Sequence, residues 1–154
     1  DIKNILIPRV KKTLHPRIHA GILAEDTDGE FENLERINAE PIDLVVVNFL
    51  PFEYAVAGPN ATIDAALDKF DLGGPTLLRS AAQNFKRVTA ICDPDDYETV
   101  LWHIAQNNAV PMELRRNLAV KALEHTSRYD ASIAGALSMF DLETGKKRMR
   151  RKSG

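Results

Sequence analysis

The apolar residues of this 154-residue chain form two kinds of pattern: short, nearly continuous runs and longer stretches with helical spacing. Two short runs, 42–47 and 88–92, have the length and composition of strands, and the β-branched first run predicts a strand buried on both faces of a parallel sheet. Apolar positions at helical spacing occupy four longer stretches, at 30–38, 62–70, 95–106 and 111–140. Because strands and helices alternate, the pattern predicts an α/β fold with a layered sheet.

A pair of glycines lies between the two predicted strands. Residues 71–74 read Asp-Leu-Gly-Gly and lead through Pro75 into an apolar helix predicted over 76–84. Glycine lets the backbone turn sharply, and proline suits a first helical turn. A helix N-terminus behind such a turn presents N–H groups and the positive end of the helix dipole, which suits an anion. We therefore predict a tight glycine turn, which has two interpretations: a ligand site or a plain helix start with an acidic flank.

Polar residues follow both predicted strands. Asn48 ends the first, and Asp93, Asp95 and Asp96 follow the second. Ligands on parallel α/β sheets bind beyond the carboxyl ends of the strands, so Asn48 and Asp93 are candidates for a site. A helix start explains the three aspartates as well as a bound cation would.

No metal or disulfide site is expected within the chain. His15 and His19 are four residues apart, but Pro16 between them argues against a metal-binding pair on a helix. The one cysteine, Cys92, has no second cysteine to pair with.

Composition and charge add one feature to this picture. The chain is 44% hydrophobic and 27% charged, as is usual for a globular domain, and it contains neither an apolar run of membrane-spanning length nor a signal peptide. We therefore expect a protein that is neither secreted nor inserted in a membrane. The net charge is −2, and subtracting six basic residues near the end leaves −8 for the remainder: Lys146, Lys147, Arg148, Arg150, Arg151 and Lys152. The prediction is a domain over 1–140 and a basic tail over 141–154, either a solvated terminus or an arm that binds RNA or an acidic partner.

Four blocks of the sequence are distinctive: KTLHPRIHAGIL at 12–23, PIDLVVVN at 41–48, DLGGPTLLR at 71–79 and KALEHTSRYD at 121–130. Together they resemble the IMP cyclohydrolase domain of the bifunctional purine biosynthesis enzyme. The family counterparts are KTLHPxxHxGIL, PIDxVVVN, D(I/L)GGxTxxR and KAFEHTxxYD. The blocks follow the family order and extend over most of residues 9–134.

The resemblance implies a fold, a reaction and a site. The fold is a three-layer parallel sheet like that of methylglyoxal synthase, and the reaction closes formyl-AICAR to IMP with loss of water, without metal or organic cofactor. The carboxamide nitrogen attacks the formyl carbon, which requires help with an amide proton and with the developing oxyanion. The resemblance assigns catalysis to Lys12 and Asp71, and purine nucleotide binding to Thr13, Asn48, Gly73, Gly74 and Thr76. Lys12 and Asp71 could equally persist as an ion pair that fixes their loops.

The chain also departs from the family pattern. It has no counterpart of the N-terminal section that carries an SxSDK strand end and an STGGT phosphate loop, and it reads RVKKTLHP over 9–16, one residue longer than the family's RVKTLHP. The active-site tyrosine of NLYPF is Leu50, and the lysine of AAKN is Gln83. Losing one donor aimed at an oxyanion typically costs about 3–4 kcal/mol. These departures predict a catalytically degenerate domain.

Two functions therefore remain open. The first keeps the chain in purine metabolism, as a divergent or degenerate cyclohydrolase; the family is cytoplasmic, and an organellar location stays open. The second makes it a non-catalytic subunit of a larger assembly, with protein partners or further copies of itself, and with RNA as a partner of the basic run. A sheet without the family's first strand is expected to expose an edge or an apolar face, which invites a partner.

Overall fold

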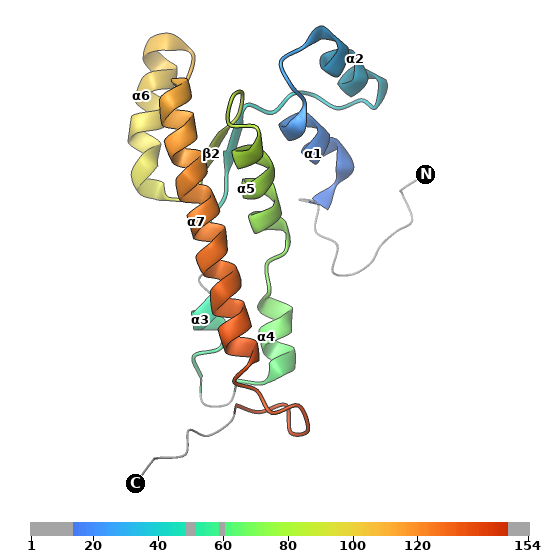
Figure 1. Cartoon of the computed structure of the whole chain (residues 1–154), viewed down its shortest axis with the longest axis vertical. Coiled ribbons are helices and arrows are strands. Elements are labelled where there is room, and N and C mark those ends of the chain that lie inside the picture. Colours follow the sequence, from blue (N-terminus) through green and yellow to red (C-terminus); the bar gives the residue numbers. More distant parts are fainter. Residues whose placement is uncertain (1–13, 49–51, 59–60, 148–154) are drawn as a thin grey trace. The chain divides into compact units, whose positions relative to one another are not determined.

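The computed structural model describes residues 14–48, 52–58 and 61–147 (Figure 1). Two compact units divide the chain: the first comprises 1–48 and 72–124, and the second comprises 49–71 and 125–154. In chain order, the elements of the described residues are α1 Pro16–Leu23, α2 Asp28–Arg36, β1 Leu44–Val46, α3 Phe52–Ala55, α4 Ile63–Lys69, α5 Gly73–Gln83, β2 Thr89–Ile91, a 3-10 helix Pro94–Asp96, α6 Tyr97–Asn107 and α7 Met112–Leu137. Helix α7 contributes residues to both units.

The first unit contains the parallel sheet that the sequence predicts. Strands β1 and β2 pair in parallel, with Leu44 opposite Thr89 and Val46 opposite Ile91, and α5 contacts both strands. Helices alternate with these strands along the chain, so the α/β prediction is confirmed.

The two strands differ in burial. All residues of β2 are buried, whereas in β1 Leu44 is 39% exposed, Val46 is 46% exposed and only Val45 is buried. The prediction that the first strand is buried on both faces is therefore wrong. A parallel strand becomes buried on both faces when layers cover each side of the sheet, and in the described part of the chain the side chains of Leu44 and Val46 are only partly covered. They line an apolar hollow of about 230 Å³, together with residues of β2 and α6: Ile91, Tyr97, Val100 and Leu101.

Arg87 joins α1 to the start of β1. Its side chain is 10% exposed and donates hydrogen bonds to the backbone oxygens of Gly21 (2.6 Å), Ile22 (3.1 Å) and Ala24 (2.8 Å). The last carbonyls of a helix lack partners within the helix, and a guanidinium group can supply several donors at once. Arg87 also pairs with the carboxylate of Asp43 at 2.5 Å. One buried side chain therefore closes the end of α1 and ties it to the chain just before β1.

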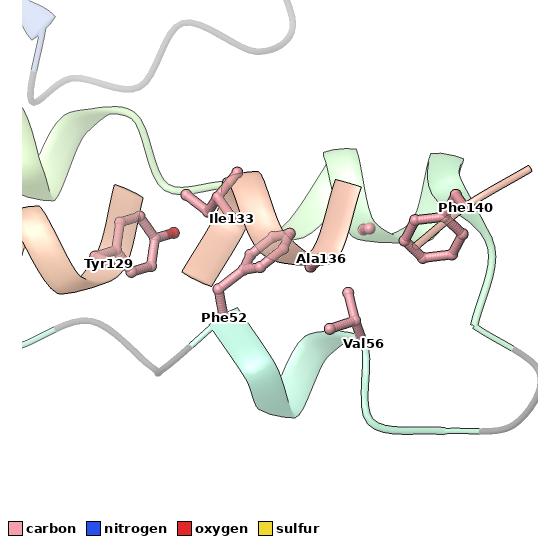
Figure 2. Close-up of a cluster of buried hydrophobic side chains, with 7 residues drawn as sticks. Phe52, Val56, Tyr129, Ile133, Ala136 and Phe140 are labelled. Atoms are coloured by element: carbon pink, nitrogen blue, oxygen red, sulfur yellow. The ribbon is translucent and has the colours of Figure 1, made fainter. Parts of the chain in front are cut away.

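The second unit has its own apolar core (Figure 2). The buried residues come from α3 and the turn that follows it, from α4, and from α7 and the turn that follows it: Phe52, Val56, Ala66, Tyr129, Ile133, Ala136 and Phe140. The ring of Phe52 lies edge-on to Tyr129, with centroids 6.3 Å apart, and edge-on to Phe70, with centroids 6.5 Å apart. The α7 residues of this core recur at helical spacing, as the sequence predicts.

The helix ends follow local sequence signals. The Thr62 hydroxyl accepts a hydrogen bond from the Ala65 N–H at the start of α4, and the Asp93 carboxylate accepts one from the Asp95 N–H. Helix α6 is capped at its C-terminal end by Asn108, which adopts a left-handed conformation with φ of 51°. These caps agree with the boundaries that the sequence predicts.

The first two lysines of the basic run take part in the second unit. Lys146 forms a β-bridge with Thr62 and Lys147 forms one with Phe140. The Lys147 ammonium group donates to the backbone oxygen of Val56. Arg148 and the later basic residues lie outside the described part of the chain.

Gly21→Ala is expected to destabilise the chain by about 1–3 kcal/mol because the site has no room for a methyl group. A Cβ at Gly21 would lie 2.2 Å from the backbone oxygen of Glu40. Urea denaturation measures the change in the free energy of unfolding. Gly29→Ala is the matched control, since nothing lies within 4 Å of its added Cβ. Equal stabilities of Gly21→Ala and the unchanged chain would refute this account.

Candidate functional site

The residues predicted for the site fall in different parts of the structure. Lys12 and Thr13 lie outside the described residues. Asn48, Gly73, Gly74 and Thr76 belong to the first unit, and Asp71 belongs to the second. Asn48 follows β1, and the other three residues of the first unit lie in the first turn of α5.

The glycine pair does not form the predicted tight turn. Helix α5 begins at Gly73, so Gly73 and Gly74 are helical, and neither has a positive φ. The prediction of a backbone conformation that only glycine can adopt is therefore wrong. Pro75 does lie in the first helical turn, where a missing N–H costs no intrahelical bond. Both glycines are buried, which gives their lack of a side chain a packing role.

Thr76 belongs to a hydrogen-bonded series that connects α5 to α1. Its hydroxyl donates to the Leu72 oxygen at 2.7 Å, and its own carbonyl accepts from the Ser80 hydroxyl at 3.0 Å. The Ser80 oxygen lies 3.0 Å from Nδ1 of His19. Because the Ser80 proton goes to Thr76, Nδ1 of His19 is the donor in that contact. This contact gives His19 a structural role between α1 and α5.

Asn48 has a partner that the sequence does not reveal. Its side-chain amide donates to the Tyr97 hydroxyl at 2.7 Å. Tyr97 begins α6 and packs against the buried cluster that includes Ile91 and Val100, while Asn48 is exposed. The contact uses one N–H of the Asn48 side-chain amide. The second N–H and the amide oxygen can still form hydrogen bonds with a ligand. The sequence offered one weak signal for this contact, which is a tyrosine at the start of the helix that follows Asp93.

Lys121 pairs with two of the three aspartates after β2. Its ammonium group lies 2.7 Å from a carboxylate oxygen of Asp93 and 2.7 Å from one of Asp96. The hydrogen bonds to Asp93 and then to Asp96 raise the pKa of Lys121 above its ordinary value. An ion triad therefore accounts for Asp93 and Asp96. Within the ranges that the structure describes, no three His, Cys, Asp or Glu side chains are grouped to hold a metal ion.

Asp71 is held through its backbone. Its N–H donates to the Tyr129 hydroxyl at 2.9 Å, and both residues belong to the second unit. Burial raises the pKa of the Tyr129 hydroxyl, and the Asp71 N–H, which favours the phenolate, opposes this by a smaller amount. A buried tyrosine hydroxyl usually has a hydrogen-bond partner. Tyr129 lies on the apolar face of the predicted long helix, so the sequence indicated that its hydroxyl has a partner but not which one.

The raised pKa of Tyr129 predicts a loss of stability at high pH. Above the ordinary tyrosine pKa of about 10, the unfolded chain releases this proton while the folded chain retains it, so the free energy of unfolding falls as pH rises. Urea denaturation between about pH 9 and 11 should therefore show a steeper decline for the unchanged chain than for Tyr129→Phe. Tyr54→Phe, at a residue that is 77% exposed, is the control and should keep the full decline. Identical pH dependence for all three proteins would contradict the assignment.

Two positions depart from the resembling motifs, Gln83 and Leu50. Gln83 is the last residue of α5 and is exposed. Leu50 lies outside the described residues.

No helix in the described part of the chain has both the length and the apolar character needed to cross a bilayer.

Comparisons with known proteins place these features in a family. The model of the AICARFT/IMPCHase bienzyme matches residues 81–153. The bifunctional purine biosynthesis protein PurH of Trichormus variabilis is 46% identical over 129 residues, which cover 82% of this chain and 26% of that protein. PurH of Anoxybacillus flavithermus is 47% identical over 148 residues, which cover 94% of this chain and 29% of that protein. The chain thus spans about a quarter of the length of these relatives.

A solved structure supports the same relationship. The crystal structure of ForH matches with a TM-score of 0.73 and 38% sequence identity. The match covers 88% of this chain and 71% of ForH. Sequence and structure therefore agree on one family and on its α/β fold.

Proposed function

The chain belongs to the AICARFT/IMPCHase family, and from this premise we propose that it is an IMP cyclohydrolase-like domain that binds a purine nucleotide but is catalytically degenerate. The observation that carries the proposal is the identity of 46–47% to PurH proteins over 82–94% of this chain. Purine biosynthesis is the process that the names of these relatives give. The proposed binding residues are Thr13, Asn48, Gly73, Gly74 and Thr76, with Lys12 and Asp71 at the reacting atoms.

The degenerate part of the proposal depends on two replaced side chains. Leu50 has no hydroxyl and Gln83 has no charge, where the resembling motifs carry a tyrosine and a lysine. Each loss of a group that stabilises the transition state typically costs about 3–4 kcal/mol in catalysis, and such losses do not simply add. We therefore expect the chain to retain nucleotide binding and to show no ring closure measurably above the uncatalysed rate.

Isothermal titration with IMP tests the binding part. The unchanged chain should bind IMP, and Asn48→Ala should weaken the affinity about tenfold, because it removes a hydrogen-bonding amide at the carboxyl end of β1. Asn107→Ala, at an exposed residue at the end of α6, is the matched control and should bind as the unchanged chain does. No binding of IMP, or equal binding by both alanine variants, would contradict the proposed site.

A non-catalytic subunit of a larger assembly is the second candidate function. The observation that favours it is the exposure of Leu44 and Val46 on one face of β1, a strand that, within the described residues, pairs with β2 alone. An open edge flanked by apolar side chains is a surface on which another chain can pair. The charged residues of the basic run would add a salt-sensitive contact to RNA or acidic protein.

Light scattering after size-exclusion chromatography tests this second candidate. The unchanged chain should elute as an assembly, and Val46→Glu should dissociate it by placing a charge beside the edge of β1. Leu142→Glu, at a residue that is 82% exposed, is the control and should leave the assembly intact. A stable monomer without salt-sensitive affinity for RNA would count against the subunit hypothesis.

A further inference from the structure

The Tyr129 ring is held in place by the core of the second unit. Tyr129 is 5% exposed, and its ring lies edge-on to Phe52 at an interplanar angle of 83° (Figure 2). Ile133 and Ala136 continue the same buried face of α7. A close-packed ring of this kind has little freedom to change rotamer, so the position of its hydroxyl is also fixed.

That hydroxyl holds the backbone at Asp71. The Asp71 N–H donates to it at 2.9 Å. Asp71 lies in the short connection between α4, which ends at Lys69, and α5, which begins at Gly73. Phe70, one residue earlier, packs edge-on against Phe52. Two consecutive residues of the connection are therefore tied to the same buried cluster, which restricts the direction in which the Asp71 carboxylate can point.

We propose that Tyr129 is the positioning residue for the Asp71 carboxylate; this inference rests on the proposed function, in which Asp71 lies at the nucleotide. Tyr129 is buried and acts through the Asp71 backbone, so it is not a catalytic residue. Tyr129→Phe keeps the aromatic ring and removes this acceptor from the Asp71 N–H. The ring packing and the positioning contact can therefore be separated experimentally.

Hydrogen exchange measured by NMR tests the contact itself. The Asp71 amide of the unchanged chain should be protected, and Tyr129→Phe should make it exchange about tenfold faster. Tyr54→Phe removes an exposed hydroxyl in the same unit and should leave this rate unchanged. An unprotected Asp71 amide in the unchanged chain would overturn the proposal, even if Tyr129→Phe failed to fold.

A double-mutant cycle on IMP affinity tests the positioning role. Tyr129→Phe should weaken IMP binding severalfold in the unchanged chain and should have no further effect in Asp71→Asn, because the contact acts through that carboxylate. A merely structural effect of Tyr129 would weaken binding by the same factor in both backgrounds, and that result would overturn the positioning role alone. If the unchanged chain binds no IMP, the proposed function fails and the positioning role fails with it. The protected Asp71 amide would remain, so the two failures are distinguishable.

Discussion

Leu50→Tyr combined with Gln83→Lys is expected to raise the rate at which the chain converts formyl-AICAR to IMP by about 10²–10³-fold. The physical reason is that the tyrosine hydroxyl and the lysine ammonium group restore two donors that the resembling motifs carry and this sequence lacks. A donor already oriented toward a developing oxyanion lowers the barrier without reorganisation during the reaction. The absorbance of IMP follows the reaction directly.

Two controls decide how such a gain is interpreted. Leu50→Tyr combined with Gln106→Lys adds the same groups but places the lysine on the exposed side of α6, and it should give a much smaller gain. Asp71→Asn in the restored chain should abolish the gained activity. Equal rates for the restored chain and the unchanged chain would show that these two positions do not explain the degeneracy.

Arg87→Met is expected to lower the free energy of unfolding by about 3–5 kcal/mol. The variant keeps much of the side-chain length and removes the donors to the backbone oxygens of Gly21, Ile22 and Ala24. Each of these oxygens keeps one other donor, the Ile42 N–H at Gly21 and the Asn84 side-chain amide at Ile22 and Ala24. The expected loss therefore comes from the charged hydrogen bonds of Arg87 itself, which is only 10% exposed. Urea denaturation measures the loss.

Asp43→Asn separates the carbonyl contacts from the ion pair. The Asp43 side chain is 76% exposed, so its attraction to Arg87 is screened by water and should contribute about 0–1 kcal/mol. We expect Asp43→Asn to remain close to the unchanged chain in stability. If it is as unstable as Arg87→Met, the ion pair rather than the carbonyl contacts holds the end of α1.

Local pattern predicted most elements of this fold, but not the helices α1 and α3. The β-branched run at 42–47 and the apolar run at 88–92 each contain a strand, and the caps at Thr62 and Asp93 begin the expected helices. These features depend on side chains within a few residues of one another, which is the range that periodicity and capping rules cover.

Features that depend on distant parts of the chain were not predicted. The exposure of Leu44 and Val46 depends on which layers cover β1, and a strand pattern does not contain that information. Likewise, the glycine pair before Pro75 fits either a tight turn or the first turn of a buried helix. In the structure the two glycines are buried in the first turn of α5, and the local sequence does not contain the packing that buries them.

The candidate site shows the same division between local and distant information. Motif positions identified Asp71 and Asn48, but their partners Tyr129 and Tyr97 are 58 and 49 residues away in sequence. Arg87 similarly contacts carbonyl groups more than 60 residues earlier. Contacts between such distant residues require the tertiary structure, because no spacing rule relates them.

The rate of IMP formation from formyl-AICAR by the unchanged chain tests the central claim most directly. We predict no measurable excess over the uncatalysed reaction, even at concentrations of formyl-AICAR that saturate the chain. Absorbance of IMP, with buffer alone and the Asp71→Asn variant measured in parallel, gives the comparison. Robust turnover by the unchanged chain that Asp71→Asn abolishes would contradict the claim that its catalytic site is degenerate.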